Sequence, residues 1–505
     1  MVLQPPRWLL SLYKSAWGAI AIAGVIGFLT LLQHPLWRDE MNVWLLARDS
    51  PTFAALIENI HYDRAHPGLW HLYVAALQAL FHYPVAMQVG HWLLGLLSLI
   101  LFWRFSAFPQ WQKWLFTFGM LPFYEYSLVA RNYALGMLFL FGICALWPTR
   151  QRAYWPLAGL VALLANTNVY ALWMAIAIAA TLALEIGFAP QRRRPWLDII
   201  GSGSVIILGC AVSLYFILPP SAVATEALET SYFYLDSERL LSTIGRLFAG
   251  YYIFIPNRER WLDVAVCSLV AIAVVALVIL RLVHKPTALS FYLIANGLLL
   301  GFTYTKFMPL FTRHFGNFFL VLIAALWLSQ QSPPSTALTR HLHHLTGWSQ
   351  RSRPTFTAFF TLMLLFQLAS GLFHVGRDWV VPHSAGRAAA AYIREANLQD
   401  AVIVGSRDAE LAPLSGYLNR QIYYPERREL GSYTLFFKGD RREVHQVEVW
   451  RQTQPLVEQH GTILLVLTEP LKIPMPGLTV EPLQSFERSQ NETYHLYRVS
   501  ERLDT

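Results

Sequence analysis

The stretch AWGAIAIAGVIGFLTLLQHPLWRDEMNVWLLAR, residues 16–48, joins a long apolar run to an acidic pair, Asp39 and Glu40. The apolar part is long enough to cross the hydrocarbon core of a bilayer as a helix. No convincing signal-peptide cleavage site follows it. The stretch therefore predicts an uncleaved first membrane helix whose far end carries charged side chains.

Apolar runs of this kind recur along the chain. With 55% hydrophobic and only 14% charged residues, the protein is more apolar than an ordinary soluble domain. Eleven runs predict an α-helical polytopic membrane protein with about eleven transmembrane helices and lipid as its main surroundings. The runs are 16–33, 86–103, 114–128, 132–147, 153–165, 168–187, 197–218, 261–281, 288–304, 314–329 and 355–373.

The basic residues gather in alternate loops between these runs. Although the net charge is +8, this distribution argues against a nucleic-acid partner and is typical of loops held in the cytoplasm. We therefore expect a cytoplasmic N-terminus, a long first outward loop at 34–85, and location in a bacterial inner (plasma) membrane. The basic loops are 104–113, 150–152, 192–194, 281–285 and 340–353.

Beyond residue 373 the pattern becomes that of a soluble domain. Helical patterns at 384–397 and 441–461 alternate with short strand patterns at 401–405 and 462–468. Such alternation predicts a small α/β domain. The predicted membrane topology places this domain on the extracytoplasmic side. We therefore divide the chain into a membrane domain, 1–374, and a soluble domain, 375–505.

In this topology the uncommon polar residues beside the apolar runs collect on the outward side. Ionisable side chains near hydrocarbon are costly, so their accumulation predicts one outward-facing cavity. They are Asp39, Glu40, His61, Asp63, His66, Glu125, Arg131, Asn166, Asn168, Arg313 and His314.

Three segments resemble the GT-C class of membrane glycosyltransferases, which includes protein O-mannosyltransferases and the aminoarabinose transferase of lipid A. They are HPLWRDEMNVWLLAR (34–48), YEYSLVARNYALGML (124–138) and FMPLFTRHFGNFFLVLIAAL (307–326), although His314 stands where tyrosine is common. The segment SRDAELAPLSGYLNRQIYYP (406–425) is similar to the outward domain of bacterial relatives. The resemblance implies a GT-C-like fold and an inverting enzyme that moves a hexose or pentose from a polyprenyl-phosphate carrier to a glycan, lipid or protein acceptor. No nucleotide is expected at the site.

Transfer to a hydroxyl group requires a carboxylate that takes its proton. Asp39 is the candidate base, and Glu40 is a second catalytic candidate that would assist the acceptor or bind a metal. The alternatives are a helix cap or an ion pair with Arg38 or Arg48 for Asp39, and an exposed interfacial carboxylate for Glu40.

The leaving phosphate requires cations, and a planar guanidinium can both neutralise and orient it. We expect Arg131 and Arg313 to bind the donor phosphate, with His314 as a third ligand. Extension of Arg313 to the membrane interface is the structural alternative. Tyr133, Asn166 and Asn168 are candidates for the cavity lining, although capping of the following helix explains the asparagines equally well.

Glu125 lies in an apolar and aromatic segment, where a carboxylate needs a cation such as Arg131 or a metal ion. Together with His61, Asp63 and His66 it offers ligands for a divalent ion such as Mg, Mn or Ca. Two rival functions use similar residues. They are a transporter or flippase of a lipid-linked substrate, and a polymerase or ligase of surface polysaccharide.

The loop charges predict the orientation of the chain in the membrane. A cysteine or epitope placed in the 330–354 loop should be inaccessible from outside the cell, whereas a tag after Thr505 should be accessible, because basic loops are retained in the cytoplasm. Labelling of intact cells with a membrane-impermeant reagent measures this. The reverse labelling pattern would contradict the orientation.

Overall fold

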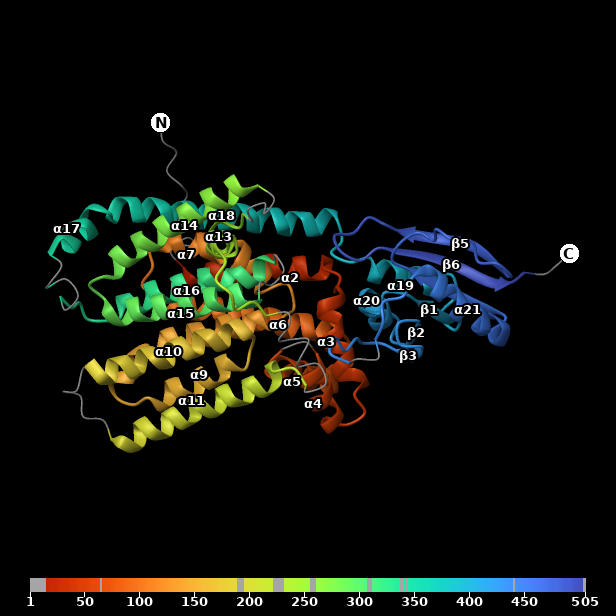
Figure 1. Ribbon diagram of the computed structural model, residues 1–505, viewed down its shortest axis with the longest axis horizontal. Coiled ribbons are helices and arrows are strands. Elements are labelled where there is room, and N and C mark those ends of the chain that lie inside the picture. Colours follow the sequence, from red (N-terminus) through yellow and green to blue (C-terminus); the bar gives the residue numbers. More distant parts are fainter. Residues whose placement is uncertain are drawn as a thin grey trace.

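The computed structural model describes residues 15–63, 66–188, 195–220, 231–254, 260–306, 311–336, 340, 343–438 and 441–502. Within these ranges nine helices are long and apolar enough to cross a membrane. The protein is thus a mostly helical membrane protein with a C-terminal α/β domain (Figure 1). The nine are α2 (Ala16–Gln33), α6 (Val85–Phe105), α8 (Tyr133–Leu146) with its short continuation η2 (Trp147–Gln151), α10 (Val169–Phe188), α11 (Trp196–Ile217), α14 (Trp261–Leu282), α15 (Pro286–Lys306), α16 (Thr312–Gln330) and α18 (Arg353–Val380).

Two of the predicted membrane runs form shorter elements. The run 153–165 is the eleven-residue helix α9 (Trp155–Ala165). The run 114–128 divides into α7 (Gln110–Thr117) and the π-helix η1 (Met120–Glu125), because Gly119 separates them and Pro122 lacks the amide hydrogen that an α-helix needs. Every residue of η1 is buried, as irregular backbone within a membrane domain must be.

The sequence pattern did not predict α13 (Ser237–Tyr252), which packs against α14 and α16. Glu238, Arg239 and Arg246 interrupt its apolar residues, so it does not appear as an apolar run. Its second half is nevertheless buried, since the helix presents one apolar face to its neighbours.

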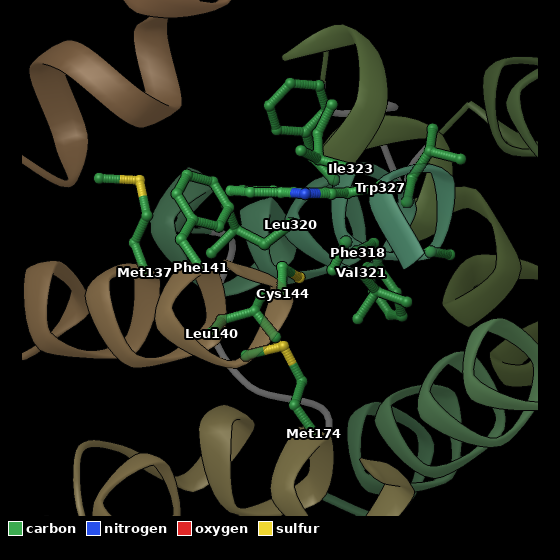
Figure 2. Packing of buried hydrophobic residues seen from close by; sticks show 14 of the residues in the cluster. Met137, Leu140, Phe141, Cys144, Met174, Phe318, Leu320, Val321, Ile323 and Trp327 are labelled. Carbon is green, nitrogen blue, oxygen red and sulfur yellow. The ribbon is translucent and has the colours of Figure 1, made fainter. Parts of the chain in front are cut away.

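The centre of the membrane domain is α16, whose residues from 315 to 328 are all buried. Figure 2 shows side chains of α16 packed next to those of α8, with Trp327 beside Phe141 and with Met174 of α10 on the far side of Leu140. The ring centroids of Phe141 and Trp327 are 5.6 Å apart. A helix that is apolar on all sides belongs at such a position, surrounded by other helices. The start of α16, which carries Arg313, is therefore held firmly.

The first outward loop is folded into α3 (Arg38–Asp49), α4 (Phe53–Tyr62) and α5 (Leu69–Phe81). These helices lie between the membrane helices and the α/β domain (Figure 1). We call this end of the helical bundle the domain-facing end. The long helix α18, preceded by α17 (His343–Arg351), continues past the predicted domain boundary at 374/375 and ends at Val380, beside the α/β domain.

The C-terminal domain is a six-stranded mixed sheet in the order β3-β2-β1-β4-β6-β5. β1 pairs in parallel with β2 and β4, and the remaining pairs are antiparallel. The four predicted elements are present as α19, β1, α21 and β4. The full set is α19 (Gly386–Glu395), β1 (Val402–Gly405), α20 (Asp408–Leu418), β2 (Ile422–Tyr424), β3 (Glu429–Gly431), α21 (Gln446–His460), β4 (Thr462–Leu467), β5 (Leu478–Phe486) and β6 (Tyr494–Glu501).

This domain docks directly on α3. Asn42 and Thr434 form two reciprocal hydrogen bonds, of 3.1 Å from the Asn42 amide and 2.8 Å from the Thr434 backbone nitrogen. The Tyr417 hydroxyl accepts from the backbone nitrogen of Leu36 at 2.8 Å. These bonds are buried or partly buried, so the α/β domain and the start of α3 form one continuous structure.

The opposite end of the bundle carries basic residues from two of the predicted basic loops, 281–285 and 340–353. Arg281, His284, Lys285 and Arg353 line one cavity of about 380 Å³. These two loops therefore meet at one end of the bundle.

Gly371 lets α18 approach the break between α7 and η1. A Cβ at this position would contact the carbonyl oxygen of Phe118 and lie 2.9 Å from the backbone of Gly119 and Met120. We expect Gly371→Ala to lower stability by about 1–3 kcal/mol, because backbone cannot move aside cheaply. Thermal unfolding of the detergent-solubilised protein measures this.

Gly376→Ala is the matched control, since it lies on the same helix and has open space around its Cα. It should leave the melting temperature unchanged or raise it, because alanine is the better helix former. Equal melting temperatures for the two variants would contradict the close packing of α18 on η1.

Candidate active site

Asp39, in the first turn of α3, lies between two arginines from distant parts of the chain. Its Oδ2 atom is 2.7 Å from Arg131 Nη1 and 3.0 Å from Arg313 Nη2. Arg131 directly precedes α8, and Arg313 lies in the first turn of α16. The structure therefore joins the residue predicted as the base to the two predicted to bind phosphate.

The structure gives less support to the alternative interpretation of Asp39 as an ion-pair partner of Arg38 or Arg48. Arg38 lies farther from the carboxylate, at 3.7 Å, and Arg48 instead binds Asp49 through two contacts of 2.7 Å. The Asp39 side chain is 25% exposed, compared with 10% for Arg131 and 9% for Arg313. The carboxylate is thus the accessible part of this cluster.

The charges set the protonation state of Asp39. Burial by itself would raise the pKa of its carboxyl group, but the guanidinium groups of Arg131 and Arg313 outweigh this effect and hold the pKa below its usual value. Asp39 is consequently ionised while both arginines contact it. A strongly stabilised carboxylate is a weak base, so an efficient base at this position needs those contacts to loosen.

Arg313 is held inside the protein and does not extend along the membrane interface. Its guanidinium carbon is 4.3 Å from the ring centre of Phe311 and 5.1 Å from that of Trp37. Glu125 Oε1 lies 4.0 Å from Nη1. The buried Nε atom has no hydrogen-bond partner among the described residues. The aromatic contacts orient the planar group and leave one donor free.

His314 belongs to an aromatic wall beside this cluster. Its ring stacks on Tyr170 at 5.2 Å with an interplanar angle of 25°, and Tyr133 lies 6.4 Å away. Tyr133 in turn stacks on Tyr126 at 5.4 Å. Tyr126 donates a hydrogen bond of 2.7 Å to the backbone oxygen of Arg313. These rings shape the surroundings of Arg313.

Asn166 and Asn168 both have structural roles. The helix capping that the sequence offered as an alternative is observed for Asn168. Asn166 donates to the backbone oxygens of Ala162 and Gly209, at 2.9 and 2.8 Å, and so joins α9 to α11. Asn168 Oδ1 accepts from the backbone nitrogen of Ala171 at 3.0 Å and caps α10. Their polar atoms are therefore engaged by the backbone.

The residues predicted as metal ligands do not form one set. Asp63 Oδ2 is 2.9 Å from His71 Nε2, and the ring of His61 packs on Tyr215 at 4.8 Å. Burial lowers the pKa of His66 to about 4. Glu125 faces Arg313, as described above. Within the described ranges, the one group of three or more acidic, His or Cys side chains close enough to share an ion is His34, Asp378 and His383.

Glu40 is fully buried and therefore cannot be an exposed interfacial carboxylate. It accepts hydrogen bonds from the backbone nitrogens of Ala130, at 2.5 Å, and Trp37, at 3.2 Å. Its Oε2 atom is also 3.2 Å from Nε2 of His34. Burial would raise the pKa of Glu40, but His34 lowers it. Glu40 thus connects the start of α3 to the segment that carries Arg131.

The sequence pattern did not identify the residues that contact the site from behind, His34, Asp378 and Glu492. His34 was visible in the quoted HPLWRDE segment, but its buried partner Asp378 is 344 residues away and gave no local signal. Glu492 of the α/β domain accepts a hydrogen bond of 3.1 Å from the backbone nitrogen of Arg38. Burial raises the pKa of Glu492 to about 7. Only the docking of the α/β domain brings Glu492 to the site.

Comparison with known proteins gives a distant likeness. No protein-family model and no curated protein matches the chain. Two solved structures, two classes of a point mutant of arabinofuranosyltransferase AftD from Mycobacteria, are similar at 14% identity, with TM-scores of 0.37 and 0.35. The match covers 97% and 95% of this chain and 42% and 41% of that one. The chain thus spans about two fifths of the length of the protein it matches.

Proposed function

We propose that this protein is an inverting glycosyltransferase that moves a sugar from a polyprenyl-phosphate carrier to an acceptor hydroxyl group on the outer side of the membrane. The observation that supports this most is the contact of one partly exposed carboxylate, Asp39, with two guanidinium groups, those of Arg131 and Arg313. One cluster thereby offers both a proton acceptor and a site for an anionic leaving group.

The arrangement suits a phosphate. Arg131 and Arg313 both contact the same oxygen of Asp39, so their donors converge on one point that an anionic oxygen can occupy. A phosphate group presents several such oxygens, and the planar fork of arginine can bind two of them at once. The Nε of Arg313, for which the described part of the chain provides no hydrogen-bond partner, supplies a further donor.

The proposed reaction is a single displacement at the anomeric carbon. The acceptor oxygen forms a bond to that carbon as the bond to the phosphate oxygen breaks, and the phosphate leaves with the electron pair as prenyl phosphate. Asp39 takes the acceptor proton. Attack on the face opposite the phosphate inverts the configuration.

Donor binding would also activate the base. When phosphate oxygens attract Arg131 and Arg313, the contacts that lower the pKa of Asp39 weaken. Its pKa then rises toward the ordinary value, and its basicity increases with it. The ion pairs of Asp39 with Arg131 and Arg313 therefore favour an order in which the donor binds before the acceptor is deprotonated.

The α/β domain borders this site. Glu492 binds the backbone of Arg38, and Glu410 lies 3.5 Å from the Arg38 guanidinium. We place the acceptor's approach to Asp39 alongside this domain, which would cover the site or receive the acceptor. The site lies at the domain-facing end, which the loop charges assign to the outside.

Asp39→Asn tests the role of the base. Asparagine has almost the same shape but cannot take a proton, so transfer should fall by about 10²- to 10⁴-fold, as is typical when a general base is lost. Donor binding should persist, because the two arginines remain. The measurement is transfer of labelled sugar from purified prenyl-phosphate hexose and pentose donors, together with donor binding and a thermal melt.

Asp49→Asn is the matched control on the same helix. Asp49 is 19% exposed and pairs with an arginine, as Asp39 does. This variant should transfer sugar at a nearly normal rate. Near-normal transfer by folded Asp39→Asn protein would remove Asp39 from the mechanism and make Glu125 the next candidate.

Arg313 variants test the phosphate site. Arg313→Lys keeps the charge but loses the fork, so donor binding should weaken less than in Arg313→Ala. Arg150→Ala, which breaks a buried pair with Glu185 on other helices, is the control for loss of a buried arginine. Binding of prenyl-phosphate sugar is measured by isothermal titration. Equal affinity of the wild type and both Arg313 variants would exclude Arg313 from phosphate binding.

A further inference from the structure

Three buried or partly buried side chains from separate segments meet at the domain-facing end, behind the Asp39 cluster. His34 follows α2, Asp378 lies in the last turn of α18, and His383 lies between α18 and α19. We propose that these three residues bind a divalent transition-metal ion, and that zinc fits them best. The inference does not depend on the proposed transfer reaction.

The distances suit a shared ion. His34 Nδ1 is 2.6 Å from Asp378 Oδ2, and His383 Nδ1 is 3.5 Å from Asp378 Oδ1. One ligand atom from each residue lies within 4.8 Å of the others. Ligands at about 2.0–2.1 Å from a tetrahedral zinc ion are themselves separated by roughly 3.3 Å. Side-chain movements of about an ångström would therefore complete the site.

The surrounding hydrogen bonds orient the ligands. His34 Nε2 lies 3.2 Å from Glu40, which favours a proton on that nitrogen and directs the lone pair of Nδ1 toward Asp378. Asp378 Oδ1 accepts from Gln490 at 2.6 Å and from the Tyr124 hydroxyl at 2.9 Å. A carboxylate behind a ligating histidine is the usual outer layer of a zinc site.

The charges also favour a divalent ion. Glu40 and Asp378 are both buried, with fully inaccessible side chains. A protonated His34 between them supplies one positive charge for two negative charges, whereas a divalent ion with neutral histidines supplies two. Arg387 donates to the backbone oxygens of Leu32 and His34 and not to either carboxylate. A closer balance of buried charge is energetically favourable.

Two histidines and one carboxylate are a common zinc ligand set that leaves a fourth position for water or another oxygen. The Tyr124 hydroxyl is a further oxygen beside these residues, 3.4 Å from His383 Nδ1. Nitrogen ligands disfavour magnesium and calcium, which prefer oxygen. The donor set therefore identifies the class of metal.

A bound ion would connect α2, α18 and the α/β domain at one point. Through His34 and Glu40 it would also hold the backbone of Ala130, next to Arg131, and the first turn of α3, which carries Asp39. The three ligands are thus positioning residues for the Asp39 cluster.

The test uses the purified full chain with any affinity tag removed, stripped with a chelator, loaded with Zn²⁺ and desalted. Wild-type protein should retain about one zinc ion per chain by mass spectrometry and should melt at a higher temperature when loaded. Asp378→Asn and His383→Asn should each lower the retained zinc at least tenfold and abolish the thermal response. His495→Asn, which removes a buried histidine of the α/β domain that pairs with Ser485, should behave like the wild type.

Cobalt substitution of the wild type gives a readout that does not require a folded variant. Co²⁺ bound by these ligands should give the visible absorption of a four- or five-coordinate nitrogen and oxygen site. Wild-type protein that retains no zinc and shows no cobalt absorption would overturn the proposal and leave His34 as a protonated bridge. Retention of zinc by folded Asp378→Asn and His383→Asn would overturn it as well.

Discussion

The buried carboxylate of Glu40 is the interaction on which the arrangement of the site depends. A charge without exposure to water must be compensated within the protein, and here a histidine and two backbone amides do so. These partners come from the end of α2, the start of α3 and the segment before α8. Compensation of one charge therefore requires three segments to meet in one geometry, and that geometry places Asp39 and Arg131 next to each other.

The Asp39 cluster differs physically from the Glu40 cluster, although the two residues are neighbours in the chain. Glu40 is fully buried, and its hydrogen bonds join separate segments of the fold. Asp39 is partly exposed, and its partners are arginines that a stronger anion can attract. The Glu40 carboxylate stabilises the structure. The Asp39 carboxylate instead pairs with two arginines whose charges can turn to a bound anionic ligand. This difference is why Asp39, and not Glu40, carries the functional proposal.

Well-packed segments surround the ion pairs of Asp39 with Arg131 and Arg313. Arg313 lies in the first turn of α16, whose residues from 315 to 328 are all buried, and the rings of Trp37 and Phe311 orient its guanidinium. The π-helix η1 ends at Glu125, whose Oε1 atom lies 4.0 Å from Arg313 Nη1. On the other side, the Asn42 and Thr434 bonds hold the α/β domain on α3. Irregular backbone and domain docking thus shape the site together.

The sequence alone determined the membrane class, most of the long helices and the alternation of helix and strand near the C-terminus. These features depend on hydropathy and periodicity within about 20 residues, which are local properties. The same local pattern did not predict α13, because charged residues interrupt its apolar ones in the sequence. It also predicted one continuous membrane helix across Gly119 and Pro122, where the structure has a break and a π-helix.

The tertiary structure decided which polar groups meet. Asp39 and Arg313 are separated by 274 positions, and His34 and Asp378 by 344. Sequence reasoning could assign Asp39, Arg131 and Arg313 to one side of the membrane, but not to one ion-pair cluster. It also could not distinguish the partly exposed Asp39 from the buried Glu40, or a cavity-lining Asn166 from one that joins two helices. Such outcomes depend on the rotation and packing of helices, which no local pattern encodes.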